Sequence, residues 1–159
     1  MVVICLYIYR LLKHFRKIQT GKLFICKLYH RFWFHHLSTK HGIEISSKTR
    51  IGKGLYIGHP YNITINYKAI IGDFCTINKG CVIGQENRGI RKGTPVIGDK
   101  VWIGANAVIV GSISIGNDVM IAPNSFVNQN IPSHSVVFGN PCIVKSKLNA
   151  TVGYIDNVN

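Results

Sequence analysis

Isoleucine or valine recurs at every sixth position along most of the chain, from residue 45 to residue 127. Thirteen positions follow this pattern in three blocks: Ile45, Ile51, Ile57; Ile65, Ile71, Ile77, Ile83; and Ile97, Ile103, Ile109, Ile115, Ile121, Val127. Seven of the thirteen are followed directly by glycine. A period of six matches neither the 3.6-residue repeat of a helix nor the two-residue alternation of a strand.

A six-residue period is what a triangular solenoid requires, so we predict an all-β solenoid, a parallel β-helix. Each flat side is a short strand whose isoleucine points inward and stacks on its copy one coil away. Each corner needs a small residue or a left-handed backbone, which Gly, Asn and Asp adopt most easily. Three hexads, about 18 residues, then form one coil, and coils stack at about 4.8 Å.

The repeat breaks phase twice, and loops that leave a repeating scaffold often carry function. The first break, between Ile57 and Ile65, brackets His59. The second lies between Ile83 and Ile97 and extrudes a loop over residues 85–94. We place the β-helix at 42–138 and a closing segment at 139–159.

The N-terminal segment, residues 1–41, has a different composition. Its apolar spacing predicts two amphipathic helices on either side of Gly21. It holds eight of the 19 Lys and Arg residues and none of the six Asp and Glu. Two interpretations stay open: a helical cap over the end of the prism, or a peripheral contact with an anionic membrane. Nucleic acid is not expected as a partner, because no recognisable binding module accompanies the charge.

The composition of the chain limits its domain number, the state of its cysteines and its relation to a membrane. With 159 residues, 47% of them hydrophobic, the chain is long enough for one domain and too apolar to be disordered. Its five cysteines contain no C-x-x-C pair, which favours reduced thiols in a cytoplasmic protein over disulfides or a structural zinc site. The longest apolar run, residues 2–9, is far shorter than a membrane span and lacks the marks of a signal peptide.

Three stretches resemble the left-handed β-helix of serine acetyltransferases: His41–His59 at its start, Thr94–Ala105 in its middle coils, and Val136–Pro141 at its closure. This resemblance implies an O-acetyltransferase that uses acetyl-CoA as donor and no metal. His59 matches the family's catalytic histidine, whose imidazole is suited to act as general base near neutral pH. Glu44 falls where the family places an aspartate that orients that ring.

The resemblance also implies where the cofactor binds. Gly104, Ala105 and Pro123 match positions whose backbone contacts the pantetheine arm in a groove between subunits, which implies a homotrimer. Ala105 and Pro123 are one coil apart, so we expect them to stack. Lys145 is placed to meet a CoA phosphate. The loop residues Arg88, Arg91 and Lys92 are further candidates for phosphate contact.

The acceptor is where this chain departs from the family. Gly58 replaces a carboxylate that helps to hold serine, and Gly93 and Thr94 replace an Arg-His pair. An amino acid carries two charges that are costly to bury unpaired. The acceptor hydroxyl therefore belongs either to a sugar, free or lipid-linked, in surface-polysaccharide biosynthesis or to L-serine. A basic N-terminus would suit a lipid-linked sugar at the inner membrane face.

Two other classes of function are also compatible with a β-helix. A metal-dependent β-helix enzyme such as a γ-class carbonic anhydrase needs three histidine ligands, and beyond residue 41 only His59 and His134 are available. A non-catalytic, membrane-associated trimeric scaffold with a relict groove is the alternative function.

Overall fold

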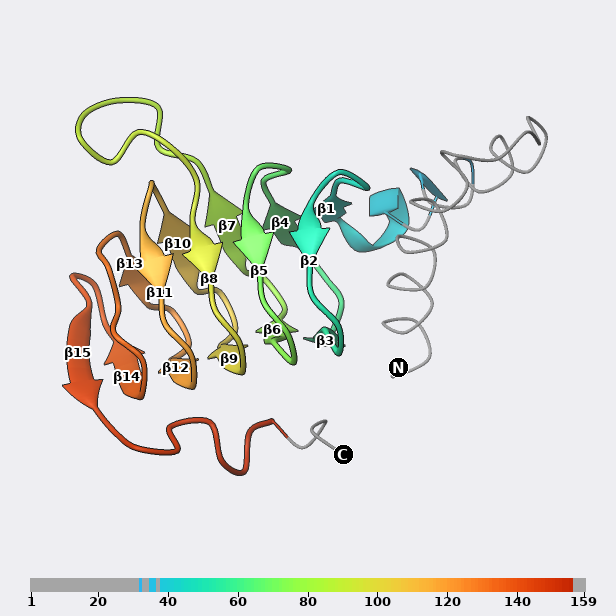
Figure 1. Ribbon diagram of the computed structural model, residues 1–159. Helices are drawn as coiled ribbons and strands as arrows, with labels where there is room; N and C mark the ends of the chain where they lie inside the picture. The colour runs from blue at the N-terminus through green and yellow to red at the C-terminus, as the bar shows by residue number, and fades with distance from the viewer. Residues whose placement is uncertain (1–31, 33–34, 37, 156–159) are drawn as a thin grey trace.

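The computed structural model describes residues 32, 35–36 and 38–155, which contain a three-sided parallel β-helix (Figure 1). The described helical residues are 32, 35–36 and 38–41, just before the first strand. The two helices predicted before and after Gly21 lie outside the described residues. The predicted all-β solenoid with parallel strands is confirmed.

Each of the first four coils contributes one short strand to each of three sheets, here called A, B and C, and the last coil contributes strands to A and C only. Sheet A contains β1 (Ile43–Ile45), β4 (Ile63–Ile65), β7 (Val82–Gly84), β10 (Val108–Val110) and β13 (Phe126–Val127). Sheet B contains β2 (Arg50–Ile51), β5 (Ile70–Ile71), β8 (Val96–Ile97) and β11 (Ser114–Ile115). Sheet C contains β3 (Tyr56–Gly58), β6 (Thr76–Asn78), β9 (Val101–Ile103), β12 (Val119–Ile121), β14 (Ser135–Phe138) and β15 (Ile143–Ser146). All pairs are parallel except β14 with β15, where the chain turns back.

The hexad isoleucines form the core because the strand register places each one beside its copy in the next coil. In sheet C, for example, Ile57 pairs with Ile77, Ile77 with Ile103, and Ile103 with Ile121. Twelve of the thirteen predicted positions are buried. Ile51 is half-buried because its strand, β2, is at the end of sheet B and has only one neighbouring strand.

Three edges separate the sheets, and each is a stack of corners. The A–B edge carries the extruded loop, which the structure places at residues 85–95 and which rises from the prism between β7 and β8 (Figure 1). The B–C edge contains the corners before each strand of sheet C. The C–A edge contains the corners after β3, β6, β9 and β12, where one coil passes into the next.

Candidate active site

The C–A edge carries His59 and the predicted pantetheine contacts on one line. Backbone bonds stack its corners: the N–H of Gly80 donates to the Tyr61 carbonyl at 2.9 Å, and that of Asn106 to the Lys79 carbonyl at 2.9 Å. The N–H of Asn124 donates to the Ala105 carbonyl, also at 2.9 Å. Tyr61, Lys79, Ala105 and Pro123 therefore occupy equivalent positions in four successive coils.

The first phase break is His59 and Pro60 themselves. Gly58 pairs with Asn78 in the sheet, while Tyr61 is the equivalent of Lys79, so two residues are inserted between them in the first coil. The insertion is closed by a bond from the Tyr61 N–H to the His59 carbonyl at 2.8 Å. His59 has a φ of 53° and is exposed. Eight other described non-glycine residues, among them Phe74 and His134, have the same conformation, so it is a feature of the corners of this prism. The two-residue insertion is what sets His59 apart from them.

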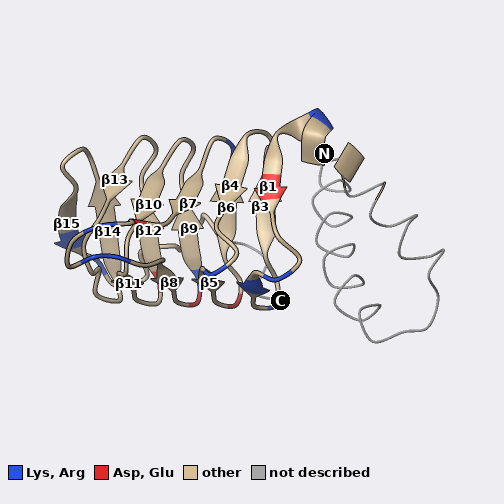
Figure 2. Ribbon diagram, turned by 90° about the horizontal axis from the view of Figure 1, so that it is seen from above, with Lys and Arg blue, Asp and Glu red and all other residues tan. Residues whose placement is uncertain are grey.

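Glu44 lies at the middle of β1 in sheet A, on its outer face. Its strand neighbour is Thr64, and both line a hollow of about 490 Å³ that also contains Tyr67. Glu44 is the one charged residue among the strands of sheet A, as the single red segment of that sheet in Figure 2 shows. Within the described residues, no hydrogen bond joins its carboxylate to the His59 ring, so the predicted pairing stays a prediction.

The predicted pantetheine contacts are closely packed at the C–A edge. Gly104 is buried, and a Cβ at this position would lie 2.8 Å from Cδ of Pro123. Ala105 is half-buried and Pro123 exposed, and the backbone bond from Asn124 joins their corners. The predicted stacking of Ala105 and Pro123, one coil apart, is therefore present.

The predicted phosphate-binding cations occupy two places. Lys145 lies on β15 opposite Val136, with Nζ 5.6 Å from the centre of the Phe138 ring. The loop cations lie on the A–B edge, which is a different edge from that of His59. Arg91 is held by Glu86 at 3.1 Å, whereas Arg88 and Lys92 are exposed. Of these four predicted cations, only Lys145 has its charged group near the C–A edge of the same chain.

Sequence reasoning missed Asn78 and Lys79, which occupy the coil between His59 and Ala105. The hexad register contains the signal that could have found them. The position after the core isoleucine is Gly58, Gly104 or Ala122 in three coils, and in the second coil it is the polar residue Asn78.

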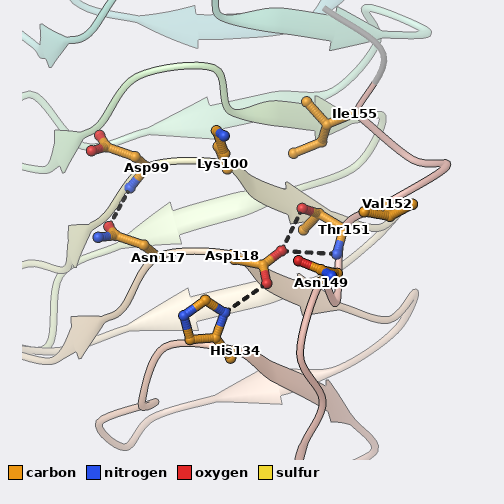
Figure 3. A pocket seen from close by; sticks show the side chains of 9 residues that line it. All are labelled: Asp99, Lys100, Asn117, Asp118, His134, Asn149, Thr151, Val152 and Ile155. Carbon is orange, nitrogen blue, oxygen red and sulfur yellow. Dashed lines mark hydrogen bonds and ion pairs between the residues drawn. The ribbon is translucent and has the colours of Figure 1, made fainter. Parts of the chain in front are cut away.

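A second hollow, of about 460 Å³, lies at the B–C edge beneath the C-terminal tail (Figure 3). There Asp118 accepts bonds from the Thr151 N–H at 3.0 Å, the Thr151 hydroxyl at 2.7 Å and the Ala150 N–H at 3.1 Å. Its carboxylate also contacts Nδ1 of His134 at 2.8 Å. Every bond drawn to Asp118 comes from the tail or the neighbouring corner, so we interpret this region as an anchor for the tail.

The charge of Asp118 follows from these contacts. Burial raises the pKa of its carboxyl, but the Thr151 hydroxyl, His134 and the two tail N–H groups outweigh burial and lower it to about 2. His134, which the sequence left without a role, is half exposed.

The two core cysteines are unsuited to nucleophilic catalysis. Burial raises the pKa of the Cys75 and Cys81 thiols to about 11, so both remain protonated at neutral pH. Each thiol donates to a carbonyl of the neighbouring coil, of Gly98 at 3.2 Å and Gly104 at 3.0 Å. The described residues contain no group of three or more side chains arranged to hold a metal ion.

Comparison with known proteins agrees with this geometry. Residues 94–129 match the family model of the bacterial transferase hexapeptide, six repeats. Serine acetyltransferase 4 of Arabidopsis thaliana is 38% identical over 115 residues, which is 72% of this chain and 30% of that protein. Serine acetyltransferase of Staphylococcus aureus strain Mu50 is 42% identical over 100 residues, 63% of this chain and 47% of that protein.

Solved structures show the same relationship. Serine acetyltransferase from Neisseria gonorrhoeae in complex with serine superposes with a TM-score of 0.74 and 27% identity, covering 90% of this chain and 57% of that one. Isoform 3 from Entamoeba histolytica in complex with cysteine gives a TM-score of 0.71 and 28% identity, with 86% and 48% covered. The chain is a serine acetyltransferase-like hexapeptide-repeat protein. Its left-handed β-helix fold, taken from the resemblance, is confirmed.

This serine acetyltransferase-like chain spans only 30% and 47% of the length of those two sequence relatives. The match therefore establishes the β-helix and its kinship with acyltransferases. No helix among the described residues is long and apolar enough to cross a membrane.

Proposed function

We propose that this protein is an acetyl-CoA-dependent O-acetyltransferase that acts on a hydroxyl of a sugar. The single observation that carries the proposal is the C–A edge, where an inserted, exposed histidine lies on the same line as Gly104, Ala105 and Pro123. The match to serine acetyltransferases supports acetyl transfer. The absence of a side chain at Gly58 favours a sugar over L-serine.

In the proposed reaction, the imidazole of His59 removes the proton of the acceptor hydroxyl as its oxygen attacks the thioester carbonyl carbon. The C–O bond forms, the C–S bond breaks, and the imidazolium returns the proton to the departing CoA sulfur. Glu44 is proposed to stabilise the imidazolium. Backbone N–H groups are proposed to stabilise the oxyanion of the tetrahedral intermediate.

Two features of the C–A edge support the proposed binding of acetyl-CoA there. The small side chain of half-buried Ala105 allows a ligand to approach the backbone of the C–A edge, while Gly104 is buried against Pro123 of the next coil. Lys145 supplies a cation beside that edge, near its closing end. When bound, acetyl-CoA supplies the activated acyl group, and the side chains of this protein position it.

A homotrimer is proposed because the phosphate candidates of one chain occupy two different edges. In a trimer, Arg88 and Lys92 of one copy would reach the C–A edge of the next. The outer face of sheet A is also suited to contact another copy, since Val82, Val108 and Phe126 lie in register along it. Sedimentation should give three times the 17.7 kDa chain mass, and a monomer at assay concentration would overturn this part.

Peripheral membrane contact at the cytoplasmic face is proposed for residues 1–41 on their charge alone, because they lie almost wholly outside the described residues. The full chain should bind anionic vesicles and not neutral ones, with binding that weakens as salt rises. Equal binding to both kinds of vesicle would contradict the proposal.

The test of the catalytic proposal is thiol release from acetyl-CoA, with L-serine and a panel of sugars and nucleotide sugars offered separately. Turnover with a sugar supports the proposal in full. Turnover with L-serine alone supports acetyl transfer and overturns the sugar acceptor. No turnover together with no binding of acetyl-CoA would leave the scaffold function instead.

A further inference from the structure

Asn78 stands out in the row of residues that directly precedes the C–A edge. Equivalent positions in the other coils are Gly58, Gly104, Ala122 and Phe138, which have no polar side chain. Asn78 belongs to the coil between the one that carries His59 and the one that carries Ala105. Since coils stack at about 4.8 Å, an acceptor lying between the base and the thioester must pass over this coil.

The amide of Asn78 is held in one orientation. Its Nδ2 donates to the Ile103 carbonyl at 2.8 Å, and a carbonyl accepts only a donor, so the other end of the amide is the oxygen. That oxygen points back to the first coil, where a Cβ built on Gly58 would lie 2.6 Å from Oδ1. It therefore occupies the space beside the residue that immediately precedes His59.

Tyr56 borders the same place. The Cβ position of Gly58 lies 3.6 Å from Cε1 of the Tyr56 ring, and this ring is half-buried on the outer face of β3. An aromatic edge and a fixed amide oxygen thus flank the bare backbone of Gly58. Few, well-placed polar groups against an aromatic surface are typical of sites that bind neutral small molecules.

We infer that Asn78 is an acceptor-positioning residue, whose Oδ1 accepts a hydrogen bond from a second hydroxyl of a neutral polyol while His59 deprotonates the reacting one. This inference rests on the proposed acetyl transfer and names its acceptor class. A sugar has neighbouring hydroxyls that can donate to an amide oxygen. The carboxylate of an amino acid has no proton to donate, and a neutral oxygen offers its ammonium no compensating charge.

The same geometry explains why residue 58 is glycine. Any side chain there would displace the Asn78 amide, because the Cβ alone falls within the contact distance of Oδ1. A carboxylate at residue 58 is therefore incompatible with the orientation in which the Asn78 amide is held here. Acceptor choice is then decided by this pair of residues rather than by His59.

The experiment compares wild type with Asn78→Ala and Asn78→Asp, using acetyl-CoA and a panel of methyl glycosides and L-serine. Asn78→Ala should raise the KM for the preferred glycoside about 10-fold, as expected for one lost hydrogen bond, with kcat and the Kd of acetyl-CoA nearly unchanged. Asn78→Asp adds a carboxylate beside Gly58 and should move the preference from neutral glycosides to amine-bearing acceptors.

The matched control is Asn117→Ala, which also removes an amide that bridges two coils, through the bond from the Asp99 N–H at 2.8 Å, but on the B–C edge. It should leave the acceptor KM unchanged. An unchanged KM in Asn78→Ala, or an equal loss in Asn117→Ala, would overturn the inference. If the proposed acetyl transfer itself is wrong, the wild-type protein will release no thiol with any acceptor. That result differs from the two outcomes that would overturn only the role of Asn78.

Discussion

Two edges of the same prism use their polar residues in opposite ways. On the B–C edge, side chains bind the backbone of the previous coil: Asp73 accepts from the Lys53 N–H at 2.8 Å, Asp99 from Asp73 at 2.7 Å, and Asn117 from Asp99 at 2.8 Å. On the C–A edge, backbone bonds join the successive corners, and the side-chain bonds between coils come from the Cys81 thiol and the Asn78 amide. The side chains of His59 and Lys79 at this edge are exposed. One edge thus stabilises the fold, and the other has side chains free for chemistry.

The two edges also give two histidines, His134 and His59, different surroundings. His134 faces a carboxylate whose remaining bonds anchor the tail, which lies along sheet C as far as the contact between Tyr154 and Trp102, with ring centres 4.9 Å apart. His59 is on an insertion that the stacking of coils does not need. A histidine paired with an aspartate is therefore not by itself evidence of catalysis, and the place in the fold decides its role.

The largest effect on acetyl transfer is expected for the variant His59→Asn. Asparagine tolerates the positive φ of this corner but cannot act as a base at neutral pH. We expect kcat/KM for acetyl transfer to fall about 10³-fold, in the range of general-base catalysis, with an unchanged melting temperature. His134→Asn is the control and should keep its activity. Equal loss in both variants would show that the two edges do not differ in function.

The reciprocal test is Asp118→Asn on the B–C edge. It removes a half-buried negative charge that accepts three bonds from the tail, so we expect the free energy of unfolding to fall by about 2 kcal/mol. Acetyl transfer should change little. Chemical denaturation measures the loss, and Asp99→Asn, which keeps its accepting oxygen, should cost less than about 0.5 kcal/mol. A stability loss confined to Asp99→Asn would contradict the anchor.

Protonation of Asp118 in acid should lower the stability of the protein, as Asp118→Asn does. The pKa of Asp118 is lowered from 3.8 to about 2, so its contribution is fully present above pH 4 and is lost as pH falls towards 2. The difference in stability between wild type and Asp118→Asn should therefore shrink over this window, measured by melting temperature against pH. A constant difference from pH 6 to pH 2 would show that Asp118 titrates normally.

The smallest expected effect concerns the loop on the third edge. Because Glu86 holds Arg91 while Arg88 and Lys92 are exposed, the double variant Arg88→Ala, Lys92→Ala should raise the KM for acetyl-CoA about threefold at low salt. High salt should remove the difference. Lys48→Ala, an exposed cation elsewhere on the A–B edge, is the control. An effect of similar size in that control would mean that net charge, not the loop, attracts the cofactor.

Much of the fold could be predicted because the hexad is a local rule repeated many times. Ile57, Ile77 and Ile103 are each placed by the same six-residue period, and their register follows from stacking one coil on the next. The same rule located His59, since a two-residue insertion is visible as a break in phase. Pairing between Glu44 and His59 could not be decided, because Glu44 lies in the middle of sheet A and His59 on an edge.

By itself, the amino-acid sequence determined the period, the inward isoleucines, the two insertions and the kinship with serine acetyltransferases. Each of these depends on residues close together in the chain or on one repeated spacing. Only the tertiary structure decided that the loop cations and His59 occupy different edges, that the tail folds back onto Asp118, and that Asn78 fills the space left by Gly58. Those contacts join residues 20 to 33 positions apart, where the side-chain directions of two coils must be known together.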